Sequence, residues 1–492
     1  MHSIHLDAID RQSKSPIYRQ IAEQIRLQIS EGRMPIGTRL PTVRELAAML
    51  SVTRLTAQNA YRELQAGGWI ESTVGRGSHV AASASTQAIL TMVGRRTTPE
   101  HIMNDMPRLS RLTGLRSLAY AESDPDLFPM ADLLRFFEHP MAQDSSLMLY
   151  GLPQGDEMLR IELVKLLAER GLEATPDDIM VTSGVSQALS LLSGCLARPG
   201  DVVVVEQPVY LGMLHVLNAL GIKAVGVPLD EEGLRLDALE QVIREHQPRF
   251  IYTIPHFQNP TGACMSVPRC KDLLALAGRY DVPIVEDDIY GLLVYDEAAP
   301  LPLKAYDTSE HVIYLSSMSK TLMPGLRIGY MLAPSKLRER VLLYRQAHDI
   351  SGPHLLQRAL ANFLHRGRFK IHLERVIPEY RARRDELMLA LAHKMPSTAQ
   401  WTRPTGGFCC WLTLPRLPAD FYQQALRRGM AFTPGEAFLI EPEEQSHIRL
   451  CFGGLPPQLI REAITILAAL LEQSSAPLSE RMRGLSHELP LV

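Results

Sequence analysis

The stretch that decides the fold reads Ser316-Ser317-Met318-Ser319-Lys320-Thr321-Leu322-Met323-Pro324-Gly325-Leu326-Arg327-Ile328-Gly329-Tyr330. Lys320 stands among small hydroxyl residues, and Arg327 follows seven positions later in a turn flanked by glycines. A lysine amine can form a Schiff base with the aldehyde of pyridoxal phosphate, and nearby hydroxyl and guanidinium groups can hold the phosphate. The stretch therefore indicates a pyridoxal-phosphate site, although a Ser-x-x-Lys pattern alone is a weak signal.

Companion motifs occur in the order that such a site requires. Residues 284–287 predict a buried strand that ends in the carboxylate of Asp287, and Tyr290 follows three positions later. An ionised carboxylate beneath the pyridine nitrogen keeps that nitrogen protonated, so that the ring can withdraw electrons. Tyr290 can hydrogen-bond the 3-hydroxyl of the cofactor. Asn259 follows a predicted strand at 250–253 and can reach the same oxygen.

Two further motifs suit the phosphate and the ring of the cofactor. Residues 182–189 predict a strand, a loop and the start of a helix, whose free backbone N–H groups favour a phosphate. Residues 206–210 end in Tyr210, which offers an aromatic face for stacking.

Helix-like and strand-like blocks alternate from about residue 113. This pattern predicts an α/β fold with a mostly parallel sheet, in which ligands bind at the carboxyl ends of the strands. After residue 345, longer helices with a few strands indicate a smaller second α/β lobe. The strand candidates are residues 178–182, 202–206, 250–253, 284–287 and 312–315.

These blocks resemble the fold-type I aminotransferases over about residues 115–470. The resemblance implies that Lys320 carries the cofactor covalently and that Arg449 clamps a substrate carboxylate through a bidentate contact. Tyr150 resembles the tyrosine that reaches the phosphate of the neighbouring subunit, which implies a homodimer. The residues implied to bind the cofactor are Lys320, Asp287, Asn259, Tyr290, Tyr210, Gly184, Val185, Ser186, Ser317, Arg327 and Tyr150.

The first 80 residues predict a winged helix-turn-helix. Apolar residues at 17, 21, 25 and 29 form one helical stripe, Thr42 and Glu45 form a capping box for a second helix, and a third helix begins after Thr53. Two strands around a Gly-rich tip follow at 69–80. The order and spacing of these motifs resemble the GntR family of regulators. The DNA contacts implied are Arg44, Thr53, Arg54, Thr56, Gln58 and Arg76.

The bulk composition is that of a soluble globular protein. The 492 residues are 46% hydrophobic and 21% charged, with a net charge of −3. The first 80 residues carry a balance of +3, which is weak support for nucleic-acid contact. No signal peptide, membrane span or metal motif is evident, so a cytoplasmic location is expected. The six cysteines form no CxxC pair, and we expect buried free thiols.

The expected organisation is a DNA-binding domain at 1–80, a linker at 81–112, an aminotransferase-like domain at 113–472 and a tail at 473–492. The combination resembles the MocR/GabR-like subfamily of GntR regulators. It implies a pyridoxal-phosphate-dependent regulator that binds a double-stranded operator and senses a small amine, an amino acid or the vitamer itself.

Three alternatives stay open. The chain can be a working aminotransferase with a DNA-binding head, since the site residues are all present; turnover is less expected than regulation. The cofactor fold can be vestigial, or the winged helix can serve protein contacts.

Overall fold

A computed structural model of the chain describes residues 6, 9–11, 13, 15–30, 33–73, 77–81, 115–296 and 299–475. These residues form two compact units. The first unit takes in the described parts of 1–120, 417–433 and 461–475, and the second takes in those of 121–416 and 434–460. Each is described by itself.

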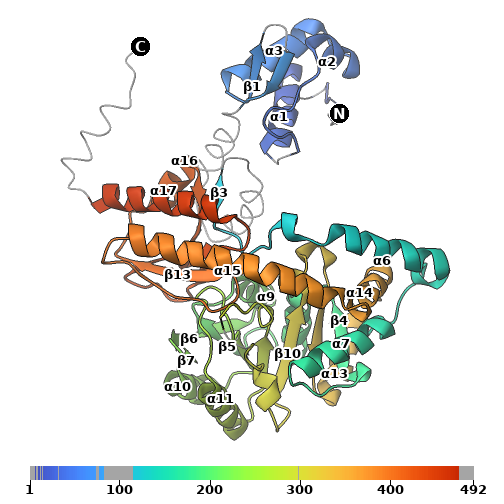
Figure 1. Ribbon diagram of the computed structural model, residues 1–492, viewed down its shortest axis with the longest axis vertical. Helices are drawn as coiled ribbons and strands as arrows, with labels where there is room; N and C mark the ends of the chain where they lie inside the picture. Colours follow the sequence, from blue (N-terminus) through green and yellow to red (C-terminus); the bar gives the residue numbers. More distant parts are fainter. Residues whose placement is uncertain are drawn as a thin grey trace. The chain divides into compact units, whose positions relative to one another are not determined.

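The N-terminal part of the first unit is a winged helix-turn-helix, as predicted from the sequence (Figure 1). Helices α1 (Ile17–Ser30), α2 (Val43–Met49) and α3 (Arg54–Ala66) pack together. Strands β1 (Ile70–Thr73) and β2 (Gly77–Val80) form an antiparallel hairpin. The hairpin tip at 74–76, and with it the predicted contact Arg76, lies outside the described residues.

The predicted capping box of α2 is present, and α3 also begins with a side-chain cap. The Thr42 hydroxyl accepts the backbone N–H of Glu45, and the Glu45 carboxylate accepts that of Thr42. Thr53 caps α3 in the same way through the N–H of Thr56. The phenol of Tyr61 donates to the carbonyl of Pro41 at 2.7 Å, which ties α3 to the segment before α2. Side-chain caps replace the hydrogen bonds that a helix start lacks, so α3 begins at a fixed residue.

The second unit is built on a mixed α/β sheet, again as predicted. Its strand order is β4-β11-β10-β9-β8-β5-β6-β7. Strands β10, β9, β8, β5 and β6 run parallel, whereas β11 is antiparallel to both of its neighbours. The strands are β4 (Ile179–Thr182), β5 (Val202–Gln207), β6 (Lys223–Asp230), β7 (Gly233–Leu234), β8 (Ile251–Thr253), β9 (Ile284–Asp287), β10 (Val312–Ser317) and β11 (Gly329–Leu332).

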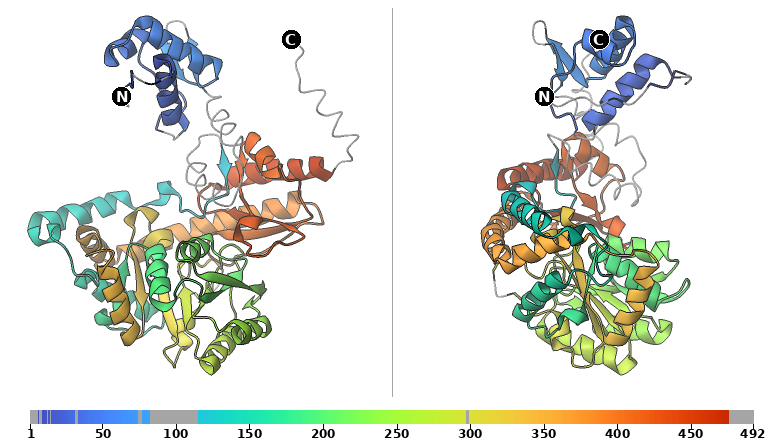
Figure 2. Two further views of the ribbon diagram at one scale, coloured as in Figure 1. Left: turned by 180° about the vertical axis from the view of Figure 1, so that it is seen from behind. Right: turned by 90° about the vertical axis from the view of Figure 1, so that its right-hand side faces the viewer.

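Helices cover both faces of this sheet, as the views in Figure 2 show. Alternate residues of one strand enter different cores. Val203 and Val205 of β5 pack in the core that also holds residues of α8, whereas Val204 packs in the core that holds residues of α11. Both faces are therefore dry, which explains why the central strands are nearly continuous apolar runs. The helices are α6 (Met130–Gln143), α7 (Glu157–Glu169), α8 (Val185–Leu196), α9 (Leu211–Ala219), α10 (Leu236–His246), α11 (Val267–Tyr280), α12 (Met318–Thr321), α13 (Ser335–Gln346), α14 (His354–His365) and α15 (Arg368–Lys394).

A smaller antiparallel sheet follows α15. Strand β13 (Cys409–Leu414) lies between β12 (Gln400–Trp401) and β16 (Ser446–Cys451). The expectation of longer helices and a few strands after residue 345 is thus confirmed. The remaining elements are β3 (Arg116–Ser117), α16 (Phe421–Arg427), β14 (Met430–Ala431), β15 (Thr433–Pro434) and α17 (Pro457–Ser475).

Two expectations need adjustment or stay untested. Four cysteines are buried as expected, but Cys195 and Cys264 are only half-buried.

Among the described helices, none combines the length and apolar character needed to cross a bilayer. Most of the predicted linker and most of the tail lie outside the described residues.

Candidate cofactor and DNA sites

We call the winged helix-turn-helix the head and the aminotransferase-like part of the chain the body. The predicted cofactor-site residues of the body lie at one edge of the large sheet. Lys320 follows the end of β10 within α12, and Asp287 ends β9. Gly184 and Tyr210 follow β4 and β5, and Arg327 precedes the antiparallel β11. Since β11 runs against its neighbours, its start lies at the same edge as their ends. Carboxyl ends of parallel strands are where α/β sheets bind ligands.

The amine of Lys320 is buried near charged and thiol groups. Its Nζ donates to the carbonyl of Ala121 at 2.5 Å. Burial lowers the pKa of this amine, although the nearby carboxylate of Glu122 opposes the shift. A lowered pKa raises the fraction of neutral amine, which is the nucleophilic form. Lys320 thus has the property that Schiff-base chemistry needs.

The carboxyl group of Asp287 is fully buried, and only one of its two oxygens accepts a side-chain hydrogen bond. Its Oδ2 accepts a 3.0 Å hydrogen bond from the phenol of Tyr252, while its Oδ1 makes no hydrogen bond with any described residue. Burial raises the pKa of Asp287 to about 7; the Tyr252 hydrogen bond and the charge of Lys320 oppose the shift. A buried acceptor without a donor is costly, so this oxygen is suited to a ligand that brings an N–H.

Asn259, Tyr290 and Arg449 form one connected polar group. The Asn259 amide donates to the Tyr290 phenol at 3.5 Å, and its carbonyl accepts from Nη1 of Arg449 at 2.9 Å. Arg449 is 3% exposed, and its guanidinium lies 4.6 Å from the centre of the Phe438 ring. The structure therefore brings the predicted carboxylate clamp next to the predicted partners of the cofactor 3-hydroxyl.

A cradle suited to a phosphate lies at the start of α8. Gly184 has φ +90°, and a Cβ at this position would lie 3.1 Å from Nη2 of Arg327. The same Nη2 donates to the carbonyl of Ser183 at 2.9 Å. No side chain caps α8, so the N–H groups of Val185 and Ser186 stand at an uncapped helix start, where anions bind.

The other predicted contacts differ in how firmly the structure holds them. The Ser317 hydroxyl bonds the Ser319 hydroxyl at 2.8 Å and the carbonyl of Ile328 at 3.0 Å, within the same turn as Lys320. Tyr210 is half-buried, and its phenol acts electrostatically on Tyr252, on Tyr290 and on Arg449. Tyr150 is 81% exposed, so within one chain it lines no enclosed site.

The described residues fit pyridoxal phosphate. The unsatisfied Oδ1 of Asp287 is the acceptor that a protonated pyridine nitrogen needs. The Gly184 turn leaves space beside Arg327, where a larger residue would be crowded. These two features lie at the same sheet edge as Lys320.

Sequence reasoning missed Tyr252 and Ser319. Tyr252 is an inward residue of β8, and its phenol orients Asp287 from the neighbouring strand. In the sequence, Tyr252 is only one residue of an apolar strand. Its position near Asp287 follows from the pairing of β8 with β9, in which Tyr252 lies opposite Val285. The order of strands in a sheet cannot be read from one sequence. Ser319 lies in the lysine stretch, but its hydroxyl contact with Ser317 depends on the turn that the folded chain makes there.

The face of α3 that is opposite its core is free for DNA. Ala57, Ala60 and Leu64 are buried against the other helices. Thr53, Arg54 and Gln58 are exposed at or near the helix start, and Thr56 is half-buried. Arg44 is exposed on α2. The described DNA contacts predicted from the sequence therefore lie outside the core of the head, which leaves them available to a groove.

Arg39 is an additional exposed cation beside the wing. It forms an isolated bridge with His79, and its side chain lies 3.7 Å from the position that a Cβ on Gly77 would occupy. Local sequence patterns do not single out Arg39, because its approach to the hairpin depends on the tertiary fold.

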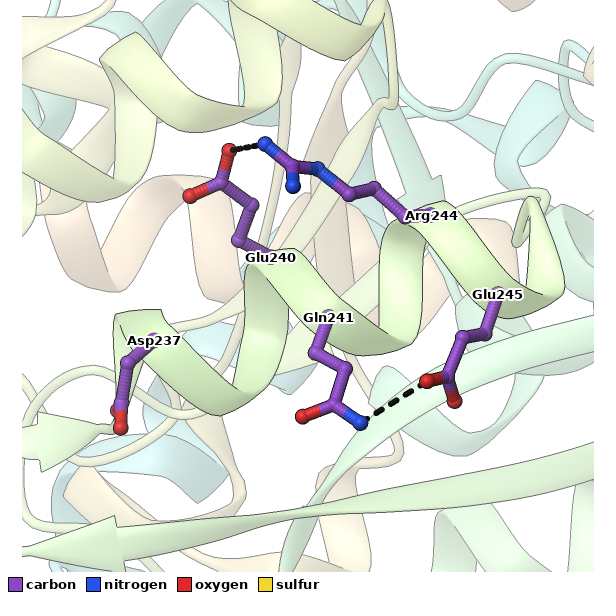
Figure 3. A pocket seen from close by; sticks show the side chains of 5 residues that line it. All are labelled: Asp237, Glu240, Gln241, Arg244 and Glu245. Atoms are coloured by element: carbon purple, nitrogen blue, oxygen red, sulfur yellow. Dashed lines mark hydrogen bonds and ion pairs between the residues drawn. The ribbon is translucent and has the colours of Figure 1, made fainter.

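A surface hollow on α10 is lined by Asp237, Glu240, Gln241, Arg244 and Glu245 (Figure 3). Its polar groups satisfy one another: Arg244 pairs with Glu240 at 2.8 Å, and Gln241 donates to Glu245 at 2.9 Å. It contains none of the predicted site residues.

Comparison with known protein families agrees with both halves of the structure. Residues 17–80 match the family described as bacterial regulatory proteins, gntR family, and residues 111–467 match aminotransferase class I and II. The chain belongs to the GntR regulators that carry an aminotransferase-like domain, which is the architecture of the MocR/GabR-like subfamily. The GntR domain implies that the protein binds DNA.

Individual relatives fall into two groups. The HTH-type transcriptional regulator YdfD of Bacillus subtilis, itself uncharacterised, is 32% identical over 479 residues, with 94% of this chain and 98% of the relative covered. The aromatic-amino-acid aminotransferase 1 of Thermococcus litoralis is 34% identical over 380 residues, covering 75% of this chain and 91% of the relative.

One solved relative of the second unit is an aminotransferase whose structure contains a form of the cofactor. The Pyrococcus horikoshii kynurenine aminotransferase, solved with PMP, is similar with a TM-score of 0.72 and 32% identity. The match covers 79% of this chain and 97% of that one. The family relationship thus points to pyridoxal-phosphate dependence.

Replacement of Asp287 separates a ligand-binding role from a purely structural one. In the cofactor-free protein, the folded pKa of about 7 lies above the unfolded value of about 3.9. Wild-type stability therefore falls as pH rises between these values, because the unfolded chain releases the proton first. We expect cofactor-free Asp287→Asn to be more stable than wild type at pH 8, with the difference vanishing near pH 4. Thermal unfolding measures this.

Addition of pyridoxal phosphate should reverse that order, because only the carboxylate can pair with a protonated pyridine nitrogen. Glu286→Gln is the matched control: this neighbouring carboxyl is also buried, with a pKa raised to about 8 by burial, but it bonds the N–H groups of Leu303 and Lys304. It should leave the stabilisation by the cofactor intact. Equal stabilisation of wild type and Asp287→Asn would remove Asp287 from the cofactor site.

Proposed function

We propose that the protein is a pyridoxal-phosphate-responsive regulator of transcription. The observation that carries this proposal is the presence, in one chain, of an exposed recognition helix and a cofactor-type site with a buried arginine. Lys320, Asp287, Asn259, Tyr290, Tyr210, Ser317, Arg327 and the start of α8 at Gly184, Val185 and Ser186 would hold the cofactor. When bound, pyridoxal phosphate supplies an aldehyde that captures amines.

Each group of residues has a separate task. Burial lowers the pKa of Lys320, which raises the fraction of the neutral, nucleophilic amine. Asp287 would hold the pyridine proton, with its own orientation set by Tyr252. Arg449, held by Asn259, would receive a carboxylate of an amino-acid effector. The effector would then be a small amine, an amino acid or the vitamer itself.

The body is proposed to work as a homodimer. Tyr150 lies in a loop with other exposed apolar residues: Leu149 is 70% exposed and Leu152 is 57% exposed. Contiguous exposed apolar residues mark association surfaces. In a dimer, Tyr150 would reach the phosphate site of the second subunit, which gives this exposed phenol a role that it lacks within one chain.

The dimer would place two heads on one operator. For the linker proposed at 81–112, about 30 residues give an r.m.s. span of roughly 30 Å, from 5–6 Å × √n. This span is similar to one helical turn of DNA, about 34–36 Å. An effector would act by binding the two arrangements of the heads with different affinities.

An active aminotransferase with a DNA-binding head is the second candidate, and the complete residue set at the sheet edge favours it. The two candidates differ in turnover. Incubation with amino donors and keto acids, followed by quantification of the new keto acid, distinguishes them: amounts in large excess over protein would establish an enzyme, whereas at most one equivalent fits a sensor.

Lys320→Ala should abolish covalent attachment of the cofactor. The wild-type protein incubated with pyridoxal phosphate should be yellow, and borohydride should fix one cofactor per chain on the peptide that contains Lys320. Lys271→Ala, which removes an exposed lysine near the Tyr306 ring, should behave as wild type. Mass spectrometry gives the answer. A fixed cofactor in Lys320→Ala would show that another lysine carries it.

Arg54→Ala should weaken operator binding by about 1–3 kcal/mol if Arg54 makes a bidentate base contact. Arg62→Ala is the matched control, because it removes the same charge from an exposed position two turns further along α3. Fluorescence anisotropy on the promoter fragment at fixed salt measures both. Losses of equal size would indicate that only net charge matters, and an unchanged affinity for Arg54→Ala would remove it from the contacts.

The fragment 1–80 should bind the same operator much more weakly than the full-length dimer, because it loses the gain from two linked heads. The full-length protein should also respond to the spacing between half-sites. Titration of both proteins on one DNA measures the difference. Comparable affinities would contradict the tethered-head arrangement.

A further inference from the structure

Two cysteines lie side by side on adjacent strands of the small sheet, beside the predicted cofactor site. Cys409 begins β13 and Cys451 ends β16, and the two are direct cross-strand partners. Their sulfur atoms are 3.8 Å apart, and each residue is 1% exposed. Figure 1 shows β13 within this smaller lobe.

The backbone geometry of this pair permits a disulfide. The N–H of Phe452 bonds the carbonyl of Phe408, which places Cys409 and Cys451 at a non-hydrogen-bonded position of the ladder. At such positions the Cα atoms are about 4.5 Å apart, within the range of about 4.4–6.8 Å that disulfides span. Rotation of the side chains can therefore bring the sulfurs to bonding distance without moving the strands far.

The cysteine pair also lies close to the polar residues of the predicted cofactor site. Arg449 lies two positions before Cys451 on the same strand, and alternate residues share a face. The thiols act electrostatically on Lys320, on Arg449 and on Tyr290. Although burial opposes it, the hydrogen bond from Cys409 and the charges of Arg449 and Lys320 lower the pKa of the Cys451 thiol. Cys451 is thus the better nucleophile of the two.

We propose that Cys409 and Cys451 are a redox-sensitive pair, which a hydroperoxide converts to a disulfide beside the cofactor site, changing the charge near Lys320 and Arg449. Lys320 is half-buried, and hydrogen peroxide is smaller than any amine effector that the proposed function admits to this site.

The chemistry balances in two steps. The Cys451 thiolate attacks one peroxide oxygen, the O–O bond breaks, and the leaving hydroxide takes a proton to become water; Cys451 is then a sulfenic acid. The Cys409 sulfur attacks the Cys451 sulfur, the S–O bond breaks, and the Cys409 proton leaves with the hydroxyl as a second water. Two thiols and one hydrogen peroxide give one disulfide and two waters.

The direct test uses the full-length protein treated with hydrogen peroxide, followed by blocking of free thiols and peptide mapping. The Cys409 and Cys451 peptides should become linked before the more exposed Cys195 is oxidised, and dithiothreitol should release them. Preferred oxidation of Cys195, or the absence of a 409–451 link, would overturn the proposal.

Three serine variants sharpen this test. Cys451→Ser and Cys409→Ser should each prevent the link, and either serves if the other fails to fold. Cys410→Ser is the matched control: Cys410 is the adjacent buried thiol on the opposite face, where it donates to the carbonyl of Thr402. It should retain the link. Loss of the link in Cys410→Ser as well would show that the reaction depends on general packing of the strand.

A second measurement tests the consequence, and it rests on the proposed role of Lys320. Burial lowers the pKa of Lys320, whereas Glu122 and an ionised Cys451 raise that pKa; a disulfide has no thiolate and leaves Glu122. The oxidised protein should therefore attach pyridoxal phosphate severalfold faster at fixed pH, as followed by absorbance, and Cys451→Ser should show no dependence on peroxide. Equal rates before and after oxidation would refute the coupling. Failure of both forms to attach the cofactor would refute the proposed function, while the mapping still decides whether the disulfide forms.

Discussion

The buried carboxyl group of Asp287 is the constraint on which the cofactor site depends. Burial, reinforced by the charge of Asp288, raises its pKa to about 7, and its Oδ1 makes no hydrogen bond with any described residue. This is an energetic cost to the cofactor-free fold, because a buried acceptor without a donor is unfavourable. The cost is explained if a cationic N–H group completes the site. The pairing of β8 with β9 and the phenol of Tyr252 hold that carboxyl in place.

Much of the architecture could be predicted from the sequence, and particular residues show why. The strand ending at Asp287 and the capping box at Thr42 follow from local periodicity and hydrogen-bonding chemistry, and both are present. Tyr252 and the Cys409–Cys451 pair could not be found in this way. Their roles arise from which strand lies beside which, and at which register, information that local patterns do not contain. The roles of the individual site residues stay predictions.

Among the described residues, the head exposes most of its predicted ligand-contacting side chains to solvent, whereas the body buries most of its own. The head presents side chains at the start of α3, where the scaffold fixes their position but leaves them exposed. The body does the reverse: it buries Arg449 and half-buries Lys320, which lowers the pKa of the lysine amine and suits both groups to a small ligand. Neither arrangement alone implies regulation. Their union in one chain, with relatives that are regulators over almost the whole length, makes a ligand-controlled DNA-binding protein the simplest account.

The central claim is that occupation of the body changes how the chain engages DNA. The most direct measurement is operator affinity as a function of half-site spacing, with and without pyridoxal phosphate, for wild type and for Lys320→Ala. The account predicts that the cofactor shifts the affinity or the preferred spacing of wild type and leaves the variant unchanged. Identical binding curves for wild type with and without the cofactor, and with amines or amino acids added to the cofactor-loaded protein, would contradict it.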